Sequence, residues 1–85
     1  MSAREVAAKV REMAKADRIT FSRHARQRMG ERGFTVENVK YMLSHNTRAV
    51  ASGETEWEIY GRDNDGNDTK VVVAIRHNIV VITVV

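Results

Sequence analysis

The stretch KVVVAIRHNIVVITVV, residues 70–85, decides the fold of this chain. It consists largely of β-branched residues, which favour strands, and His77-Asn78 interrupts it once. A two-residue turn at this point predicts an antiparallel hairpin in which Arg76 pairs with Ile79. Because paired residues lie on the same face of a sheet, this register sorts every side chain of the hairpin onto one of two faces.

One face of the predicted hairpin is wholly apolar, and we expect it to form the core together with helical residues. Its members are Val71, Val73, Ile75, Val80, Ile82 and Val84, packed against Phe21, Met29, Val39 and Leu43. The neighbouring strand, residues 55–62, alternates so that Trp57 and Ile59 join this core. The second face then gathers Glu56, Glu58, Tyr60, Arg76 and Thr83, and this mixed polar surface is where we expect chemistry.

The half of the chain before residue 46 has helical patterns. Ser2 and Glu5 form a capping box that opens a helix running to about Asp17. Its apolar stripe is narrow, so we expect it to be less firmly buried than the other helices. Residues 18–21 are expected to be a linker. Two further helices begin at the caps Ser22 and Thr35 and end near Gly33 and His45-Asn46.

Beyond residue 46 the apolar period changes to about two, which predicts strands at 47–51, 55–62, 70–76 and 79–85. The turn at 63–68 resembles the start of a calcium loop, but it lacks the downstream bidentate Glu and the flanking helices, so no metal is expected. The predicted fold is α+β, with N-terminal helices packed on one face of a four-stranded antiparallel sheet. Its 85 residues form a single domain, with an N-terminal helix at 1–17 and a core at 18–85.

Composition narrows the function classes. There is no cysteine, hence no disulfide framework and no thiolate metal site. No apolar run is long enough for a signal peptide or a membrane span, so a cytoplasmic location is expected. Residues 1–34 carry nine Lys/Arg against four Asp/Glu, whereas residues 35–85 carry five against seven. This asymmetry favours a polyanionic partner for the helical half, such as nucleic acid, or an acidic protein.

The segment FSRHARQRMGERG, residues 21–33, concentrates that positive charge. Phe21, Ala25 and Met29 recur every four residues and form an apolar stripe. The same spacing places His24, Arg28 and Arg32 along an adjacent edge of the helix. An imidazole beside fixed guanidiniums suits a phosphate-bearing partner, although a short basic helix is also a common solvated face.

This segment resembles the signature of a small bacterial family, domain of unknown function 4258, whose pattern is His-Ala-x-x-Arg-Met-x-x-Arg-Gly followed by a Ser/Thr-capped helix. The β-rich tail resembles it also, and the likeness covers roughly residues 18–85. The family in turn resembles the RelE/ParE-like toxins and the barnase, EndoU and colicin ribonucleases. That resemblance implies the four-stranded antiparallel fold and RNA cleavage without a metal or other cofactor.

The resemblance, with the surface described above, gives the candidate residues. The catalytic candidates are His24 as acid or base, Arg28 and Arg76 on the phosphate, and Thr83 or Tyr60 as hydrogen-bond donor. Arg23, Arg26 and Arg32 are the RNA-binding candidates. Neither Lys40 nor Lys70 matches the catalytic lysines of RelE-type toxins, which argues against ribosome-dependent cleavage.

Three functions remain open from the sequence. The leading one is a metal-independent endoribonuclease, the toxin of a toxin–antitoxin pair, with RNA and a cognate antitoxin as partners. The second is a non-catalytic module that binds RNA or an acidic protein through the same basic helix. The third is a toxin that blocks a protein target, as ParE-like proteins do. His24 reaches the polar sheet surface only if its helix overhangs the sheet.

Overall fold

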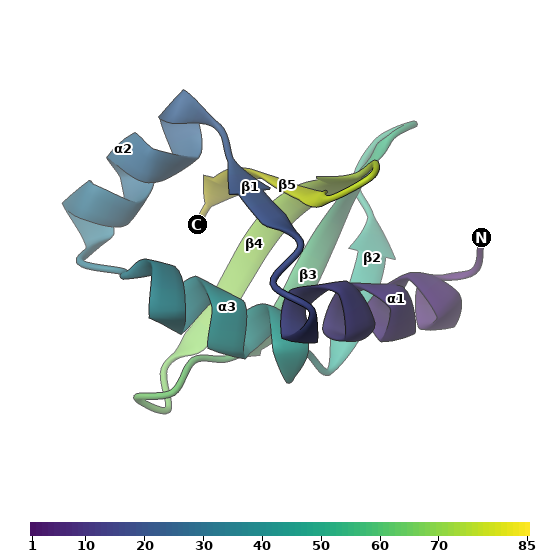
Figure 1. Cartoon of the computed structure of the whole chain (residues 1–85), viewed down its shortest axis with the longest axis horizontal. Helices are drawn as coiled ribbons and strands as arrows, with labels where there is room; N and C mark the ends of the chain where they lie inside the picture. Colours follow the sequence, from purple (N-terminus) through teal and green to yellow (C-terminus); the bar gives the residue numbers. More distant parts are fainter.

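Eight elements follow one another along the chain, and the computed structural model describes all of residues 1–85. The helices are α1 (Ala3–Lys15), α2 (Arg23–Arg32) and α3 (Val36–Ser44). The strands are β1 (Ile19–Phe21), β2 (Arg48–Ala51), β3 (Glu56–Arg62), β4 (Asp68–Ile75) and β5 (Ile79–Val84) (Figure 1). None of the three helices is both long and apolar enough to cross a membrane.

The sheet has five strands in the order β1-β5-β4-β3-β2, and β1 runs parallel to β5. The α+β class is as predicted, but the four-stranded antiparallel sheet is wrong. The expected linker contains β1, whose Ile19 pairs with Ile79 and whose Phe21 pairs with Val81. Three residues are too few to show an alternating pattern, and their strand conformation depends on a partner far along the chain.

The predicted register of the β4–β5 hairpin is wrong at the turn. Ile75, not Arg76, faces Ile79, so the connection has three residues rather than two. A one-residue shift moves side chains to the opposite face of a sheet. Ile79 and Val81 are therefore fully buried, whereas Val80 and Ile82 are only half-buried. An irregularity beside Val72 restores the expected pairing of that residue with Thr83.

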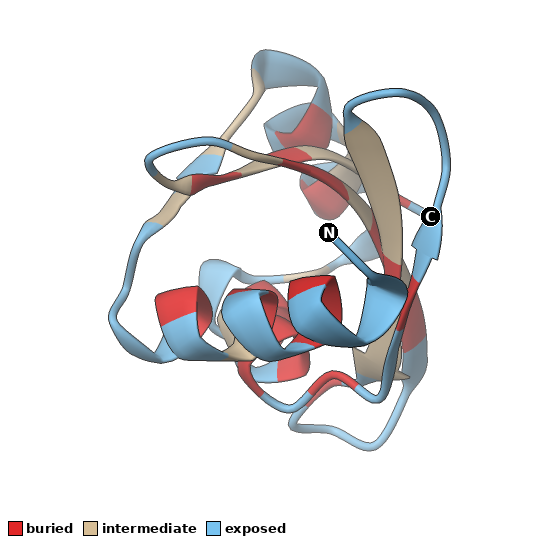
Figure 2. Ribbon diagram, turned by 90° about the vertical axis from the view of Figure 1, so that its right-hand side faces the viewer, coloured by how far each residue is buried: buried red, intermediate tan, exposed pale blue.

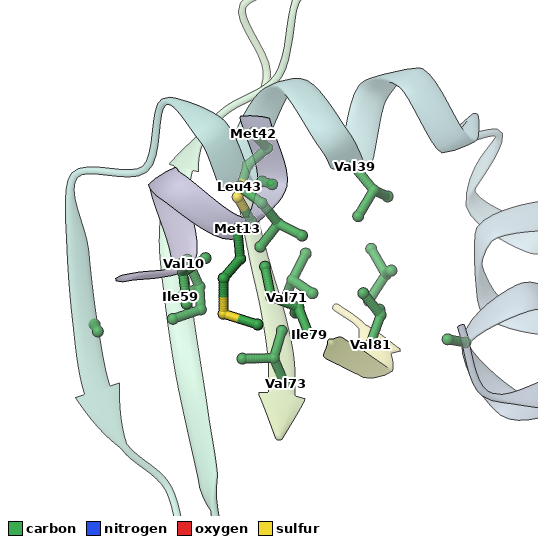
Figure 3. Packing of buried hydrophobic residues seen from close by; sticks show 14 of the residues in the cluster. Val10, Met13, Val39, Met42, Leu43, Ile59, Val71, Val73, Ile79 and Val81 are labelled. Atoms are coloured by element: carbon green, nitrogen blue, oxygen red, sulfur yellow. The ribbon is translucent and has the colours of Figure 1, made fainter. Parts of the chain in front are cut away.

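The core lies between the sheet and the helices α1 and α3. Val10 and Met13 of α1 and Val39, Met42 and Leu43 of α3 point toward β3, β4 and β5 (Figure 3). The strands meet them with Ile59, Val71, Val73, Ile79 and Val81 (Figure 3). The expectation of a loosely buried first helix is wrong, because Val6 and Val10 are both completely buried. The buried side of α1 faces the sheet (Figure 2).

The predicted helix boundaries are confirmed by their hydrogen bonds. Ser2 and Thr35 both form capping boxes, and the Ser22 side chain accepts from the Ala25 N–H. Gly33 ends α2 in the left-handed region, at φ 72°. The helices are thus defined locally, whereas the sheet depends on long-range pairing.

Candidate functional site

Helix α2 covers the part of the β5 edge that β1 leaves open. The Ser22 hydroxyl donates to the Ile82 carbonyl over 2.9 Å, and the Arg28 Nε donates to the Val84 carbonyl over 3.4 Å. Ala25 and Met29 anchor the helix in the core. In Figure 1, α2 lies beside β1 and β5, apart from α1. The helix therefore covers a strand edge that could otherwise pair with another strand.

The outward side of α2 is strongly basic, and we call it the α2 surface. It consists of the exposed Arg23, His24, Arg26 and Arg32, with the partly buried Arg28 at its border. The first turn holds no acidic residue to balance the positive end of the helix dipole. Glu31 is the one acid of the helix, and it lies 3.5 Å from Arg28. Positive potential therefore gathers at the N-terminal end of α2.

Two arginines of the α2 surface lie over aromatic rings. The Arg26 guanidinium is 5.5 Å from the Phe21 ring centroid, and that of Arg32 is 5.9 Å from the Phe34 ring. Stacked guanidiniums keep their in-plane N–H groups available for a second partner, such as a phosphate. The His24 imidazole makes no hydrogen bond within the protein and stands one helical turn before Arg28.

The face of the sheet opposite the helices carries the polar residues expected there, and we call it the outer face. Glu56, Glu58 and Tyr60 pair with Ala74, Val72 and Lys70. Thr83 also faces Val72, from the other side. The β3–β4 pairing differs by two residues from the predicted one, which keeps every side chain on its expected face.

The five catalytic candidates do not form one cluster. Arg28 contacts the carbonyl of the residue after Thr83, so these two lie at the same end of β5. Tyr60 is two strands away, or about 10 Å. Arg76 lies in the β4–β5 turn, six residues from the Lys70 that faces Tyr60, which is about 20 Å along a strand. The structure thus separates Arg76 from the other candidates.

Residues 21–85 match the family model for domain of unknown function 4258. The chain belongs to the DUF4258 family. The match begins at the first residue of the basic segment, so α2, α3 and strands β2 to β5 all lie within it. No curated protein and no solved structure matches the chain.

A second polar cluster of this DUF4258 domain lies around Tyr60 on the outer face. The Arg48 guanidinium stacks 4.4 Å from the Tyr60 ring centroid, and the Lys70 ammonium lies 5.9 Å from it. The Tyr60 hydroxyl donates to Glu58 over 2.9 Å. This bond to Glu58 is the main reason why the pKa of Tyr60 is raised, followed by desolvation. Tyr60 therefore stays protonated at neutral pH.

Beside this cluster the DUF4258 domain has an open groove of about 950 Å³. The end of α3 and the β3–β4 hairpin form its walls, with Tyr41, His45, Arg48, Tyr60, Arg62 and Lys70 among the lining side chains. The backbones approach closely at Gly61, where an added Cβ would lie 3.1 Å from the Asn46 Cα. A side chain at Gly61 would push α3 away from β3.

The residues of this groove were not among the sequence-based candidates, apart from Tyr60. His45 caps the end of α3 as predicted, and its ring also stacks on Tyr41 with centroids 4.1 Å apart. The spacing of four residues between Tyr41 and His45 was the available signal, because such pairs meet on a helix surface. Arg48 and Lys70 gave no signal of their own, since only the strand register brings them together.

Proposed function

We propose that this DUF4258 protein is a metal-independent endoribonuclease that binds RNA through the α2 surface, with His24 as the proton acceptor. The observation that carries the proposal is the exposed cationic side of α2, where a free imidazole stands among four arginines. Phosphate contacts from arginine supply most of the affinity in RNA and DNA complexes. Imidazole is the side chain best suited to move a proton near neutral pH.

The reaction uses the 2′-hydroxyl of the RNA as its nucleophile. His24 takes the hydroxyl proton while the 2′-oxygen forms a bond to phosphorus, and the bond from phosphorus to the 5′-oxygen breaks. Solvent reaches this exposed surface and supplies the proton for the leaving oxygen. Arg28 and Arg32 offset the charge that builds up on the phosphate oxygens. Thr83, at the adjacent end of β5, is placed to donate a hydrogen bond.

The proposed mechanism does not use Arg76, and it gives Arg23 and Arg26 the role of steering the RNA. Arg76 lies in the β4–β5 turn, at the opposite end of β5 from the Val84 carbonyl that Arg28 contacts. Arg23 and Arg26, at the N-terminal end of α2, act on the RNA backbone rather than on the reacting phosphate. The toxin role inferred from the family resemblance belongs to this same proposal, with an acidic antitoxin segment as the natural inhibitor of a basic surface.

A second candidate is a non-catalytic RNA-binding module, which two observations favour. Arg28 already donates to the Val84 carbonyl and lies near Glu31, so part of its hydrogen-bonding capacity is used within the protein. The α2 surface is also a convex helix face rather than a cleft, and catalytic sites are usually concave. Such a module would hold RNA through the same arginines without cutting it.

The test is cleavage of a 5′-labelled RNA by purified wild type, His24→Ala and His77→Ala. His77 is an equally exposed histidine in the β4–β5 turn and serves as the matched control. We expect His24→Ala to lose about 100- to 10,000-fold in rate and His77→Ala to remain active. EDTA should leave the rate unchanged, and products should end in a cyclic 2′,3′-phosphate.

A substrate with a 2′-deoxy sugar at the cut site should resist cleavage, because the nucleophile is gone. Equal activity of His24→Ala and wild type would exclude His24 from the reaction. If folded wild type binds RNA but leaves it intact, free or on ribosomes, the non-catalytic module is correct. If it neither binds nor cuts RNA, a protein target for the α2 surface becomes the remaining proposal.

A further inference from the structure

The groove beside α3 has a cationic side built around one arginine. No carboxylate lies within ion-pair distance of Arg48, whereas Arg62 in the same groove is paired with Asp68 over 3.2 Å. The Arg48 guanidinium lies over the Tyr60 ring, 4.4 Å from its centroid, which restrains its position while N–H donors remain available for a ligand. Such an arrangement binds phosphate or carboxylate with two parallel hydrogen bonds.

Lys70 adds a second positive charge next to Arg48. Its ammonium group is 3.9 Å from Glu58, too far for a short hydrogen bond, and it lies on the same Tyr60 ring. Glu58 also accepts a hydrogen bond from the Tyr60 hydroxyl. The carboxylate is therefore shared between two partners, and the side of the groove at Arg48 and Lys70 keeps an excess of positive charge.

The opposite side of the groove is aromatic. Tyr41 and His45 lie nearly parallel, at 19° between their planes, and both are exposed. The His45 Nδ1 lies 2.9 Å from the Tyr41 carbonyl, which can only accept, so this nitrogen carries the hydrogen. The ring is held at one edge, and its Nε2 remains free to bond a ligand.

The acidic residues that line the groove have partners within the protein. Asp63 accepts from the backbone N–H groups of Asp65 and Asn67, over 2.9 and 3.0 Å. Asp68 is occupied by Arg62. Neither carboxylate is left to attract a cation, so the chemistry of the groove points to an anion that also carries a flat ring.

We propose that this groove is a binding site for a nucleoside phosphate, with its phosphate on Arg48 and Lys70 and its base stacked on the Tyr41–His45 pair. The volume of about 950 Å³ is ample for one nucleotide. The ligand is either a free nucleotide or one unit of an RNA strand, because both present the same phosphate and base. The site is separate from the α2 surface and does not depend on RNA cleavage.

The test is titration of ¹⁵N-labelled protein with adenosine 5′-monophosphate, followed by NMR. We expect the amide signals of Thr47, Gly61 and Lys70 to shift, and inorganic phosphate alone to bind more weakly. Tyr41→Ala should weaken nucleotide binding about tenfold, the scale of one lost stacking contact, while Tyr41→Phe keeps it. Arg48→Ala should abolish binding, and Arg76→Ala, at an exposed arginine outside the groove, should change it little.

Two further arms separate the alternatives. A ten-nucleotide RNA that shifts the groove signals of Thr47, Gly61 and Lys70 at a lower concentration than the mononucleotide does identifies the ligand as part of a strand. The reverse order identifies a free nucleotide. Equal affinity for phosphate and nucleotide, or tighter binding of a hexaglutamate peptide, would overturn the proposal. His24→Ala should bind the mononucleotide normally, so a failure of the cleavage proposal leaves this one intact.

Discussion

Arg28 joins α2 to the sheet by donating from its Nε to the carbonyl of Val84 over 3.4 Å. The same residue lies in the basic segment at the start of the region that matches the family model. Since strand β5 has no neighbour beyond Val81 on this side, the bond occupies an acceptor that would otherwise be open. Arg28 therefore helps to hold α2 on the sheet, a role that the sequence of a basic helix does not indicate.

Arg28→Ala should lower the free energy of unfolding by about 1 kcal/mol, because it leaves a strand-edge carbonyl without its donor. For a domain of this size that corresponds to a fall of about 4–8 °C in Tm. Arg26→Ala is the control, since Arg26 contacts only the Phe21 ring and should cost less. Thermal unfolding followed by circular dichroism measures both. Equal Tm values for wild type and Arg28→Ala would show that the Val84 bond contributes nothing.

The two glycines of α2 should respond to alanine in opposite directions. Gly30 lies inside the helix with no atom near its missing Cβ, so Gly30→Ala should stabilise the protein by about 0.5–1 kcal/mol. Gly33 has φ 72°, where a Cβ is strained, so Gly33→Ala should cost roughly 1–2 kcal/mol. Urea unfolding of both variants measures the difference. A stabilising Gly33→Ala would contradict the left-handed end of α2.

The register of β5 can be tested with one charge placed at two adjacent positions. Val81→Asp should unfold the domain, because Val81 is completely buried and the carboxylate would have no partner. Ile82→Asp should remain folded, because Ile82 is half-buried beside the irregularity of β5. Circular dichroism and gel filtration distinguish the two results. The reverse outcome would restore the register of a two-residue turn.

Asp63 should make stability depend on pH. Its pKa lies below the ordinary value, mainly because the Asn67 N–H donates to it, with a further bond from the Asp65 N–H. A lowered folded pKa stabilises the protein above the unfolded value of about 3.9, and this contribution is lost as pH falls through the folded pKa.

Asp63→Asn should therefore be less stable than wild type at pH 7, with the gap closing as pH falls from about 5 to below 3. Glu54→Gln, on an exposed loop, should show no such gap at any pH. Urea midpoints at each pH give the measurement. A gap between wild type and Asp63→Asn that stays constant with pH would mean that the charge of Asp63 has no role.

Local signals in the sequence predicted the helices well. The features that were predicted incorrectly depend on strand pairing between residues far apart in the chain. Ser2, Ser22 and Thr35 cap the helices as expected, because a cap needs only residues a few positions away. Strand β1 was missed because its three residues are ordered by β5. The side chains of residues 79–82 were assigned to the wrong faces because a two-residue and a three-residue turn differ by one position, whereas Thr83 and Val84, beyond the irregularity, lie on their predicted faces.

The candidate site also has a part that local sequence predicts and a part that depends on distant pairing. The α2 surface could be predicted, since four-residue spacing places its charges on one helix. The observed distance between Arg76 and Tyr60 could not be predicted. A shift of two residues in the pairing of β3 with β4 moves Tyr60 about 7 Å further along β4 without changing its face of the sheet. The groove could not be predicted either, because its residues come from α3, β2, β3 and β4 and share no pattern along the chain.

The parallel pairing of Ile19 with Ile79 also has a consequence for how this protein folds. These residues are roughly 60 positions apart, so a large loop must close before β5 gains its second neighbour. Closure of this kind slows folding relative to helical proteins of similar length. Until it occurs, α2 is not held against β5, and the open β5 edge can pair with another copy of the chain instead. We therefore expect the α2 arginines to reach their final positions late in folding. Folding at high protein concentration should favour aggregates over a correctly docked α2.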